Sequence, residues 1–320
     1  MSGSVKPSPG ERPDHILLLF IDGLGLGLAD PDINPCFSLT SPLFRHHRDE
    51  AFPKEIIFSG YALGLDANLG VEGLPQSATG QTALLTGVNA AAAIGRHLNG
   101  FPNEALRQII AVHSILKICT QGGLRAAFLN TFRPPFFDLD PFQIIRHLSV
   151  TTVCNLYAGL RFFDLEDLKA ERSVYQDLTG ASLREMGFEV PLFTPEKAGE
   201  IVARASSRYA FCLFEYFQTD IAGHSRSRPR ALQVLGDLAH FLNSLLHSVD
   251  LTTTLVVVCS DHGNIEDLRV KGHARNPAMA LLFGCGAAAL LPKLRALTDV
   301  APALLHLHGL SPLRHADTLP

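Results

Sequence analysis

The sequence lacks an excess of positive charge, long apolar runs and closely spaced cysteines. Its 27 Lys and Arg residues and 31 Asp and Glu residues leave a formal net charge of -4, so no basic surface indicates a nucleic acid or an anionic membrane as the partner. The apolar run at residues 15–21 is too short to cross a membrane or to act as a signal segment. We therefore expect a cytoplasmic protein that acts on a small substrate; the oligomeric state stays open.

The spacing of the cysteines excludes the sites that need clustered thiolates. The chain has 6 cysteines and no CxxC pair, which argues against an iron–sulfur cluster or a structural zinc finger. Several of them lie inside apolar runs, so we expect reduced and mostly buried thiols. They are Cys36, Cys119, Cys154, Cys212, Cys259 and Cys285.

The remaining composition and the order of apolar segments predict an α/β fold. The chain of 320 residues is 47% hydrophobic, which is enough to form one large core. Continuous apolar runs typical of buried strands alternate with helical spacing, and this predicts a mostly parallel sheet covered by helices on both faces. We predict strands at 16–21, 124–130, 208–219, 255–259 and 278–283, a hairpin at 56–62, and helices at 79–85, 106–119, 232–249, 291–297 and 300–307.

Three regions with different composition predict the domain organisation. Residues 1–14 are polar and rich in Ser, Pro and Gly, so we expect a flexible tail. Residues 133–195 show short helical segments and Pro-containing turns, and we interpret them as a small cap or insertion. Residues 15–132 and 196–320 then form the core.

Carboxylate and imidazole side chains stand at the ends of three predicted strands and before a fourth. They are Asp22, Asp220 with His224, Asp261 with His262, and His273. In open α/β sheets, ligands bind at the carboxyl ends of the strands, and this mixture of donors suits Zn or Mn. Each position taken alone is also compatible with a turn or a surface residue. The whole set at one edge of one sheet indicates a metal site.

The segment 76–87, with the sequence QSATGQTALLTG, combines a hydroxyl with a predicted helix start. Backbone N–H groups at such a start bind anions, which would hold a phosphate beside Ser77. We interpret Ser77 as a nucleophile; the alternative is an ordinary helix N-cap. Thr79 and Thr82 are rival nucleophiles in the same segment.

These motifs, taken together, resemble the alkaline phosphatase superfamily of two-metal phosphoryl-transfer enzymes. Within it, the chain is most similar to the branch of cofactor-independent phosphoglycerate mutase and phosphopentomutase. The matching segments are Ile21-Asp22-Gly23-Leu24-Gly25, Ser77 with Gly80 and Thr86-Gly87, Asp220-Ile-Ala-Gly-His224, Ser260-Asp261-His262-Gly263-Asn264, and His273-Ala-Arg-Asn-Pro277, and Gly100-Phe-Pro-Asn-Glu104 is also similar to the mutase branch. The missing Cys/Ser-x-Pro-x-Arg motif around Ser77 argues against a sulfatase.

The resemblance implies an alkaline phosphatase-like three-layer fold with two divalent cations, Zn or Mn. It implies a first cation held by Asp220, His224 and His273, a second held by Asp22, Asp261 and His262, and a phosphoserine intermediate on Ser77. Two departures bear on the reaction. Only about sixty residues form the predicted insertion where the mutases carry a large cap, and Ala274 replaces the usual Thr.

We therefore expect a phosphomonoester hydrolase that acts on a small phosphorylated substrate. The alternatives are a phosphosugar or phosphoglycerate mutase and a metal-binding scaffold without turnover; the intact nucleophile and ligand set argue against the scaffold. Arg96, His97 and Arg275 are candidate substrate-binding residues, although Arg96 is also compatible with a solvated surface cation. In the predicted insertion, substrate selection could fall to Arg133, Arg146 and Arg161.

Overall fold

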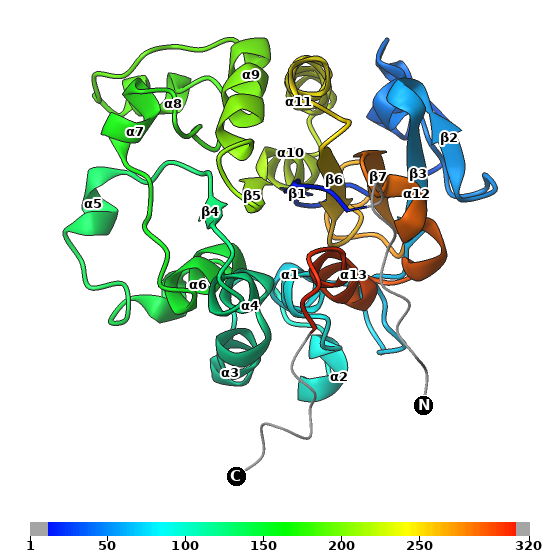
Figure 1. Cartoon of the computed structure of the whole chain (residues 1–320). Coiled ribbons are helices and arrows are strands. Elements are labelled where there is room, and N and C mark those ends of the chain that lie inside the picture. The colour runs from blue at the N-terminus through cyan, green and yellow to red at the C-terminus, as the bar shows by residue number, and fades with distance from the viewer. Residues whose placement is uncertain (1–11, 312–320) are drawn as a thin grey trace.

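Seven strands form one sheet in the computed structural model, which describes residues 12–311 (Figure 1). Their order across the sheet is β2-β3-β7-β6-β1-β5-β4. They are β1 (His15–Ile21), β2 (Lys54–Ile56), β3 (Gly60–Leu65), β4 (Ala126–Phe128), β5 (Phe211–Tyr216), β6 (Thr254–Ser260) and β7 (Ala278–Gly284). All the predicted strands and the predicted hairpin are present, and most of the predicted tail, residues 1–11, lies outside the described residues.

The sheet is parallel in one half and antiparallel in the other. Strands β4, β5, β1 and β6 pair in parallel, whereas β7, β3 and β2 add antiparallel pairs beyond β6. A parallel return needs a crossover of a dozen or more residues, usually a helix. Residues 261–277 form an irregular loop that turns straight back into β7, so the sheet is more mixed than the sequence predicts.

Helices cover both faces of the sheet and create two cores (Figure 1). Side chains alternate along β1: Leu18 and Phe20 belong to one core, and Leu17 and Leu19 belong to the other. The first core is covered by α1 (Ser77–Thr86), α3 (Glu104–His113), α4 (Ile115–Gln121), α6 (Val150–Tyr157) and α13 (Val300–Leu307). The second is covered by α9 (Pro195–Ser206) and α11 (Arg228–Ser248). This is the predicted three-layer α/β arrangement.

Two predicted helices differ in the structure. The helix predicted at 106–119 is divided into α3 and α4 by Ser114, whose backbone is extended and whose side chain accepts a hydrogen bond from the Lys117 N–H. The prediction of a helix at 291–297 is wrong. Pro292 lies in a short 3-10 turn that ends at Leu294, where the backbone is again extended.

The predicted insertion at 133–195 contains short helices, and one of them packs into the main core. Val150, Val153 and Cys154 of α6 are fully buried in the core beneath α1 and α3. The remaining short helices are α2 (Ala90–Ile94), α5 (Pro134–Phe137), α7 (Leu165–Lys169), α8 (Ala181–Glu185), α10 (Gln218–Ser225) and α12 (Ala287–Leu290). The division into a core and an insertion stays a prediction.

The cysteines agree with the expectation of mostly buried thiols. Five of the six cysteines are buried, Cys285 is half-buried, and none of the six forms a disulfide within residues 12–311. None of the helices in the described chain combines the length and the apolar character needed to cross a membrane.

Candidate metal centre

The register of the central strands brings the acidic residues to one edge. Ile21 pairs with Tyr216 on β5 and with Ser260 on β6, so the residues that follow these strands emerge side by side. Asp22 follows β1 directly and Asp261 follows β6 directly. Asp220 lies in the first turn of α10, the helix that begins at Gln218 after β5.

Ser77 is the first residue of α1, and its hydroxyl faces the same edge. Its Oγ lies 3.1 Å from Nε2 of His262. The helix is preceded by Gln76, so the N-cap alternative for Ser77 is wrong. The rival hydroxyls of Thr79 and Thr82 are fully buried and donate to the carbonyls of Gln76 and Ala78. Ser77 is therefore the hydroxyl of this segment that points at the acidic cluster.

One group of donors surrounds His262. Its Nε2 lies 3.2 Å from Asp22 Oδ1 and 3.5 Å from Asp261 Oδ2. Both His262 and Asp261 have no exposed surface. These three side chains offer donor atoms that all lie within 4.8 Å of one another, which is a distance set suited to a shared metal ion.

A second group lies around Asp220. His224 Nε2 is 3.3 Å from Asp220 Oδ2, and His273 Nε2 is 3.6 Å from Asp220 Oδ1. The two imidazoles approach to 3.2 Å through their Nε2 atoms. The ring of His262 stacks on His273 with centroids 3.7 Å apart, and His262 also has a donor atom within 4.8 Å of those of Asp220 and His273. The structure therefore brings all six predicted ligands into one cluster.

Backbone carbonyls orient the two imidazoles of the second group. Nδ1 of His273 lies 2.8 Å from the carbonyl oxygen of Pro75, and Nδ1 of His224 lies 2.8 Å from that of Lys271. A carbonyl on one ring nitrogen fixes the proton there and leaves the other nitrogen free to bind a metal. The side chain of His224 is 39% exposed, so the cluster opens to solvent on this side.

The charges in the cluster fit a bound cation. Burial raises the pKa of Asp22, and burial and the charge of Asp22 raise the pKa of Asp261 well above its usual range. Burial alone would lower the pKa of His262, but the charges of Asp261 and Asp22 raise it to about 10. The carboxylates thus hold a proton on the imidazole as a counter-charge. A divalent cation bound by these donors would supply that charge instead.

Buried polar atoms without partners support the same fit. Asp22 Oδ1, Asp261 Oδ2 and His262 Nδ1 are buried and form no hydrogen bond of acceptable geometry with residues 12–311. Leaving such atoms unpaired costs about 1–3 kcal/mol each, and more for charged groups. Coordination of a metal ion by the two carboxylates would satisfy their unpaired oxygens.

Three polar residues that the sequence analysis missed hold this cluster in place. Gln81 Nε2 donates to Asp22 Oδ2 at 3.1 Å, and Asn264 Nδ2 donates to Asp220 Oδ1 at 2.6 Å. Glu266 is fully buried and accepts the backbone N–H groups of Gly25 and Asn264. Asn264 belongs to the Ser260–Asn264 motif, which could have indicated its role. No local sequence pattern indicates the roles of Gln81 and Glu266.

The predicted substrate-binding residues belong to two segments, with Arg96 and His97 adjacent after α2 and Arg275 in a later loop. Arg96 follows α2 and is exposed, and His97 Nε2 contacts the Val71 carbonyl oxygen at 3.3 Å. Arg275 is exposed in the loop between β6 and β7, two residues after His273. Their role in substrate binding stays a prediction.

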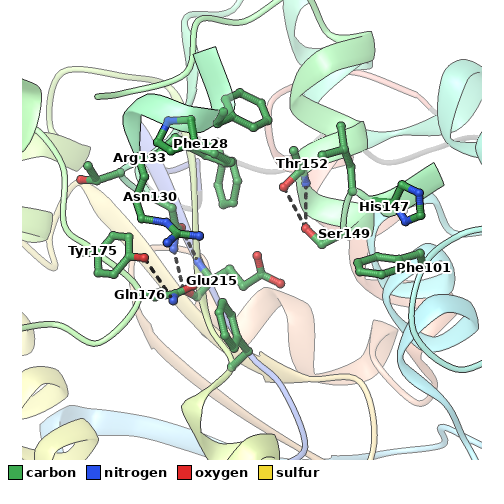
Figure 2. Close-up of a pocket in the computed structure, with 16 residues that line it drawn as sticks. Phe101, Phe128, Asn130, Arg133, His147, Ser149, Thr152, Tyr175, Gln176 and Glu215 are labelled. Atoms are coloured by element: carbon green, nitrogen blue, oxygen red, sulfur yellow. Dashed lines mark hydrogen bonds between the residues drawn. The ribbon is translucent and has the colours of Figure 1, made fainter. Parts of the chain in front are cut away.

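A cavity of about 580 Å³ opens at the carboxyl ends of β4 and β5 (Figure 2). Side chains of Phe101, Asn130, Arg133, Ser149 and Glu215 border the same space in Figure 2. Arg133 is thus the one of the three suggested arginines that lines this cavity. Arg161 instead pairs with Asp167, and Arg146 is exposed on a short 3-10 turn.

Comparison with known proteins gives two kinds of similarity. Residues 191–312 match the family model described as Metalloenzyme superfamily. The chain is 32% identical over 123 residues to the 2,3-bisphosphoglycerate-independent phosphoglycerate mutase of Paracoccus denitrificans (strain Pd 1222), which is 36% of this chain and 24% of the mutase. A mutase of the same name from Thermomicrobium roseum is 30% identical over 34% of this chain and 23% of its own. The chain therefore spans about a quarter of the length of these curated relatives.

Solved structures share the fold over nearly the whole chain. The phosphoglycerate mutase of Leishmania mexicana has a TM-score of 0.58 at 10% identity, with 97% of this chain and 98% of that chain covered. The alkaline phosphatase of the Antarctic bacterium TAB5 has a TM-score of 0.55 at 15% identity, with 93% and 99% covered. At these identities, the similarity shows a shared fold and no shared activity.

The fold, the donor set and the family model together support an alkaline phosphatase-superfamily metalloenzyme, as the resemblance of the motifs implied. The description of the family model that matches residues 191–312 implies divalent metal ions. The curated relatives are named as mutases, and one solved structure with the same fold is an alkaline phosphatase. The matched range 191–312 includes Asp220, Asp261 and His273, whereas Asp22 and Ser77 enter the site through the fold.

Proposed function

We propose that the protein is a two-metal phosphomonoester hydrolase that acts through a phosphoserine on Ser77. The observation that carries the proposal is the contact of Ser77 Oγ with His262 Nε2 at 3.1 Å. His262 also has donor atoms within 4.8 Å of those of Asp22 and Asp261 in one group and of those of Asp220 and His273 in the other. The nucleophile and both ligand groups thus meet at one imidazole.

We assign the ligands of the two cations from the two groups of donors. Asp22, Asp261 and His262 would hold one Zn or Mn ion, and Asp220, His224 and His273 would hold the other. When bound, the cations neutralise charge on the phosphate oxygens and lower the pKa of a nearby hydroxyl. The chain's own contribution is a rigid frame, because the donors follow three paired strands and are held by Gln81 and Asn264.

The reaction has two steps at Ser77. The start of α1 presents backbone N–H groups that have no intrahelical acceptor, and these would hold phosphate oxygens in place. Ser77 Oγ bonds to phosphorus as the ester P–O bond breaks, and the leaving alcohol takes up the proton that the hydroxyl releases. Water then attacks phosphorus, the Oγ–P bond breaks, a proton of the water returns to Ser77 Oγ, and inorganic phosphate leaves.

A mutase is the second candidate, because the curated relatives at 30% and 32% identity carry that name. A mutase returns the phosphoryl group to the substrate and releases little phosphate. It must therefore hold the dephosphorylated substrate during transfer, for which the mutases use a large cap. The short region 133–195 favours the hydrolase.

The test is phosphate release from p-nitrophenyl phosphate by metal-stripped protein reloaded with Zn or Mn. We expect metal-dependent release that Ser77→Ala abolishes while its metal content stays unchanged. The matched control is Ser207→Ala, because Ser207 is exposed and directly follows α9 in the chain. This variant should keep full activity. Equal release by wild type and Ser77→Ala would overturn the nucleophile. Conversion of a phosphorylated sugar or glycerate to its isomer without phosphate release would favour the mutase.

A further inference from the structure

We propose that the cavity at the ends of β4 and β5 binds the leaving group of the ester and selects a flat aromatic leaving group over a small, hydroxyl-rich or anionic one. This inference rests on the proposed phosphoryl-transfer function and adds the chemical class of the substrate.

The cavity lies within the reach of one ester molecule from the metal ligands. Glu215, on the cavity wall, is the register partner of Phe20, two residues before Asp22. With about 3.3 Å per residue along a strand and about 4.8 Å between strands, the Cα atoms of Glu215 and Asp22 are separated by roughly 8 Å. Alternation along the strands places both side chains on the face covered by α1. The leaving group of a phosphate held beside Asp22 is therefore within reach of this cavity.

Six Phe and Tyr rings line the cavity. The rings that line the cavity are Phe101, Phe128, Phe132, Phe136, Tyr175 and Phe217. Phe132 and Phe136 lie 4.6 Å apart between centroids, and Phe128 and Phe132 form an edge contact at 6.0 Å. The ring of Phe101 is 51% exposed at the mouth. A volume of about 580 Å³ is in the range that holds small organic ligands, and such rings favour offset or edge-to-face contacts with another ring.

The polar groups on the floor are engaged with one another. The Asn130 side chain donates to the Glu215 carbonyl at 2.8 Å and accepts the Glu215 N–H at 2.8 Å. The Thr151 hydroxyl donates to Glu215 Oε2 at 2.6 Å, and Ser149 and Thr152 contact each other at 2.8 Å. A substrate with many hydroxyls would have to break these pairs, whereas a flat ring leaves them intact.

The charges near the cavity also disfavour a small anionic leaving group. Glu215 places a carboxyl on the floor, and Arg133 and His147 are the cationic or titratable bases that line the walls among the described residues. A phosphoglycerate carries a carboxylate in addition to its phosphate, whereas the single guanidinium of Arg133 shares this lining with the carboxyl of Glu215 and leaves no strongly cationic surface for it. Arg133 extends beside Asn130 in Figure 2 and is able to stack its planar guanidinium on an aromatic ring.

The test measures binding without turnover. Metal-loaded Ser77→Ala protein is titrated by calorimetry with 1-naphthyl phosphate and with glycerol 3-phosphate. We expect the naphthyl ester to bind at least about tenfold more tightly. A second change, Phe101→Ala, should weaken naphthyl binding by about two- to tenfold and leave glycerol 3-phosphate unchanged. The matched control is Phe142→Ala, because Phe142 is 58% exposed and contacts Tyr157 outside the cavity lining.

Two results would overturn the proposal. One is equal affinity for the two esters. The other is an equal loss of affinity for 1-naphthyl phosphate in Phe101→Ala and in the control Phe142→Ala. Since calorimetry needs no catalysis, an inactive wild type with tight naphthyl binding would contradict the hydrolase and support the cavity. An active wild type with equal affinities would contradict the cavity alone.

Discussion

Gly80 of α1 packs directly on the backbone of Asp261. A Cβ atom at Gly80 would lie 2.9 Å from the Asp261 carbonyl oxygen and 3.2 Å from the Asp261 Cβ. The missing side chain therefore lets the helix that carries Ser77 approach the strand end that carries Asp261 and His262.

The variant Gly80→Ala sets helix propensity against this close contact. Propensity alone would stabilise the helix by about 1 kcal/mol, but the clash is with backbone, and overpacking of this kind costs about 1–3 kcal/mol. We expect a net loss of stability in urea unfolding and weaker metal binding. Gly236→Ala is the control, since Gly236 lies inside α11 with nothing within 4 Å of the added atom; it should stabilise the protein. A gain of stability in both variants would contradict the account that Gly80 is needed for the close contact with Asp261.

Gln81 positions Asp22 through its hydrogen bond of 3.1 Å. We expect Gln81→Leu to lower metal affinity by about 10–100-fold, the effect usual for a residue that orients a metal ligand. Competition with a chromogenic chelator measures this affinity. Gln233→Leu changes an exposed glutamine on α11 and should leave it unchanged. Wild-type affinity in Gln81→Leu would show that Asp22 needs no such support.

Asp261→Asn should have opposite effects on the two states of the site. Without metal, it removes a buried carboxyl beside the charge of Asp22, so we expect the free energy of unfolding to rise by about 1–3 kcal/mol. With metal, it removes a ligand, so the stabilisation by bound ions should shrink. Unfolding with and without chelator measures both. Asp49→Asn, at a side chain that is 69% exposed, should change neither, and a destabilised metal-free Asp261→Asn would contradict the repulsion.

Glu215 predicts a pH dependence of stability. Burial raises its pKa from 4.5 to about 7; the hydrogen bond from Thr151 opposes this rise and the charge of Asp22 adds to it. The folded chain therefore holds this proton more tightly than the unfolded chain. The resulting stability is fully present below about pH 4.5 and is lost as the pH rises to about 7.

The variant Glu215→Gln isolates this contribution. Between about pH 4.5 and pH 7, the metal-free wild type should lose up to about 3 kcal/mol relative to Glu215→Gln. Chemical denaturation across this range measures the difference. Glu185 is an exposed residue of α8, so the free energy of unfolding of Glu185→Gln should change with pH as that of the wild type does. A difference between wild type and Glu215→Gln that does not vary with pH would show that Glu215 is ionised throughout.

Much of the site follows from sequence because its ligands stand at the ends of apolar runs. Asp22 and Asp261 follow strands that are buried on both faces, so their position at the sheet edge is predictable from the pattern alone. Gln81 and Glu266 were missed because their partners lie 59 and 241 residues away in the chain. Such contacts depend on the packing of α1 and of the loop after β6, which local patterns do not encode.

The direction of β7 and the cavity were unpredictable for a related reason. An apolar run such as 278–283 specifies a buried strand but not its direction, which here follows from the irregular loop 261–277. The cavity joins residues from β4, β5 and the start of α6, and it exists only once these elements are packed together. The pairing of Asn130 with the backbone of Glu215 illustrates this, since it joins two strands across 85 residues.

The most direct test of the central claim is the site of covalent phosphorylation. Metal-loaded protein is mixed with p-nitrophenyl phosphate, quenched in acid within a turnover, digested and mapped by mass spectrometry. The account predicts a phosphoryl group on Ser77 that appears only with metal bound and is absent from Ser77→Ala. Turnover without any phosphopeptide, or a phosphoryl group on Thr79 or Thr82, would contradict it.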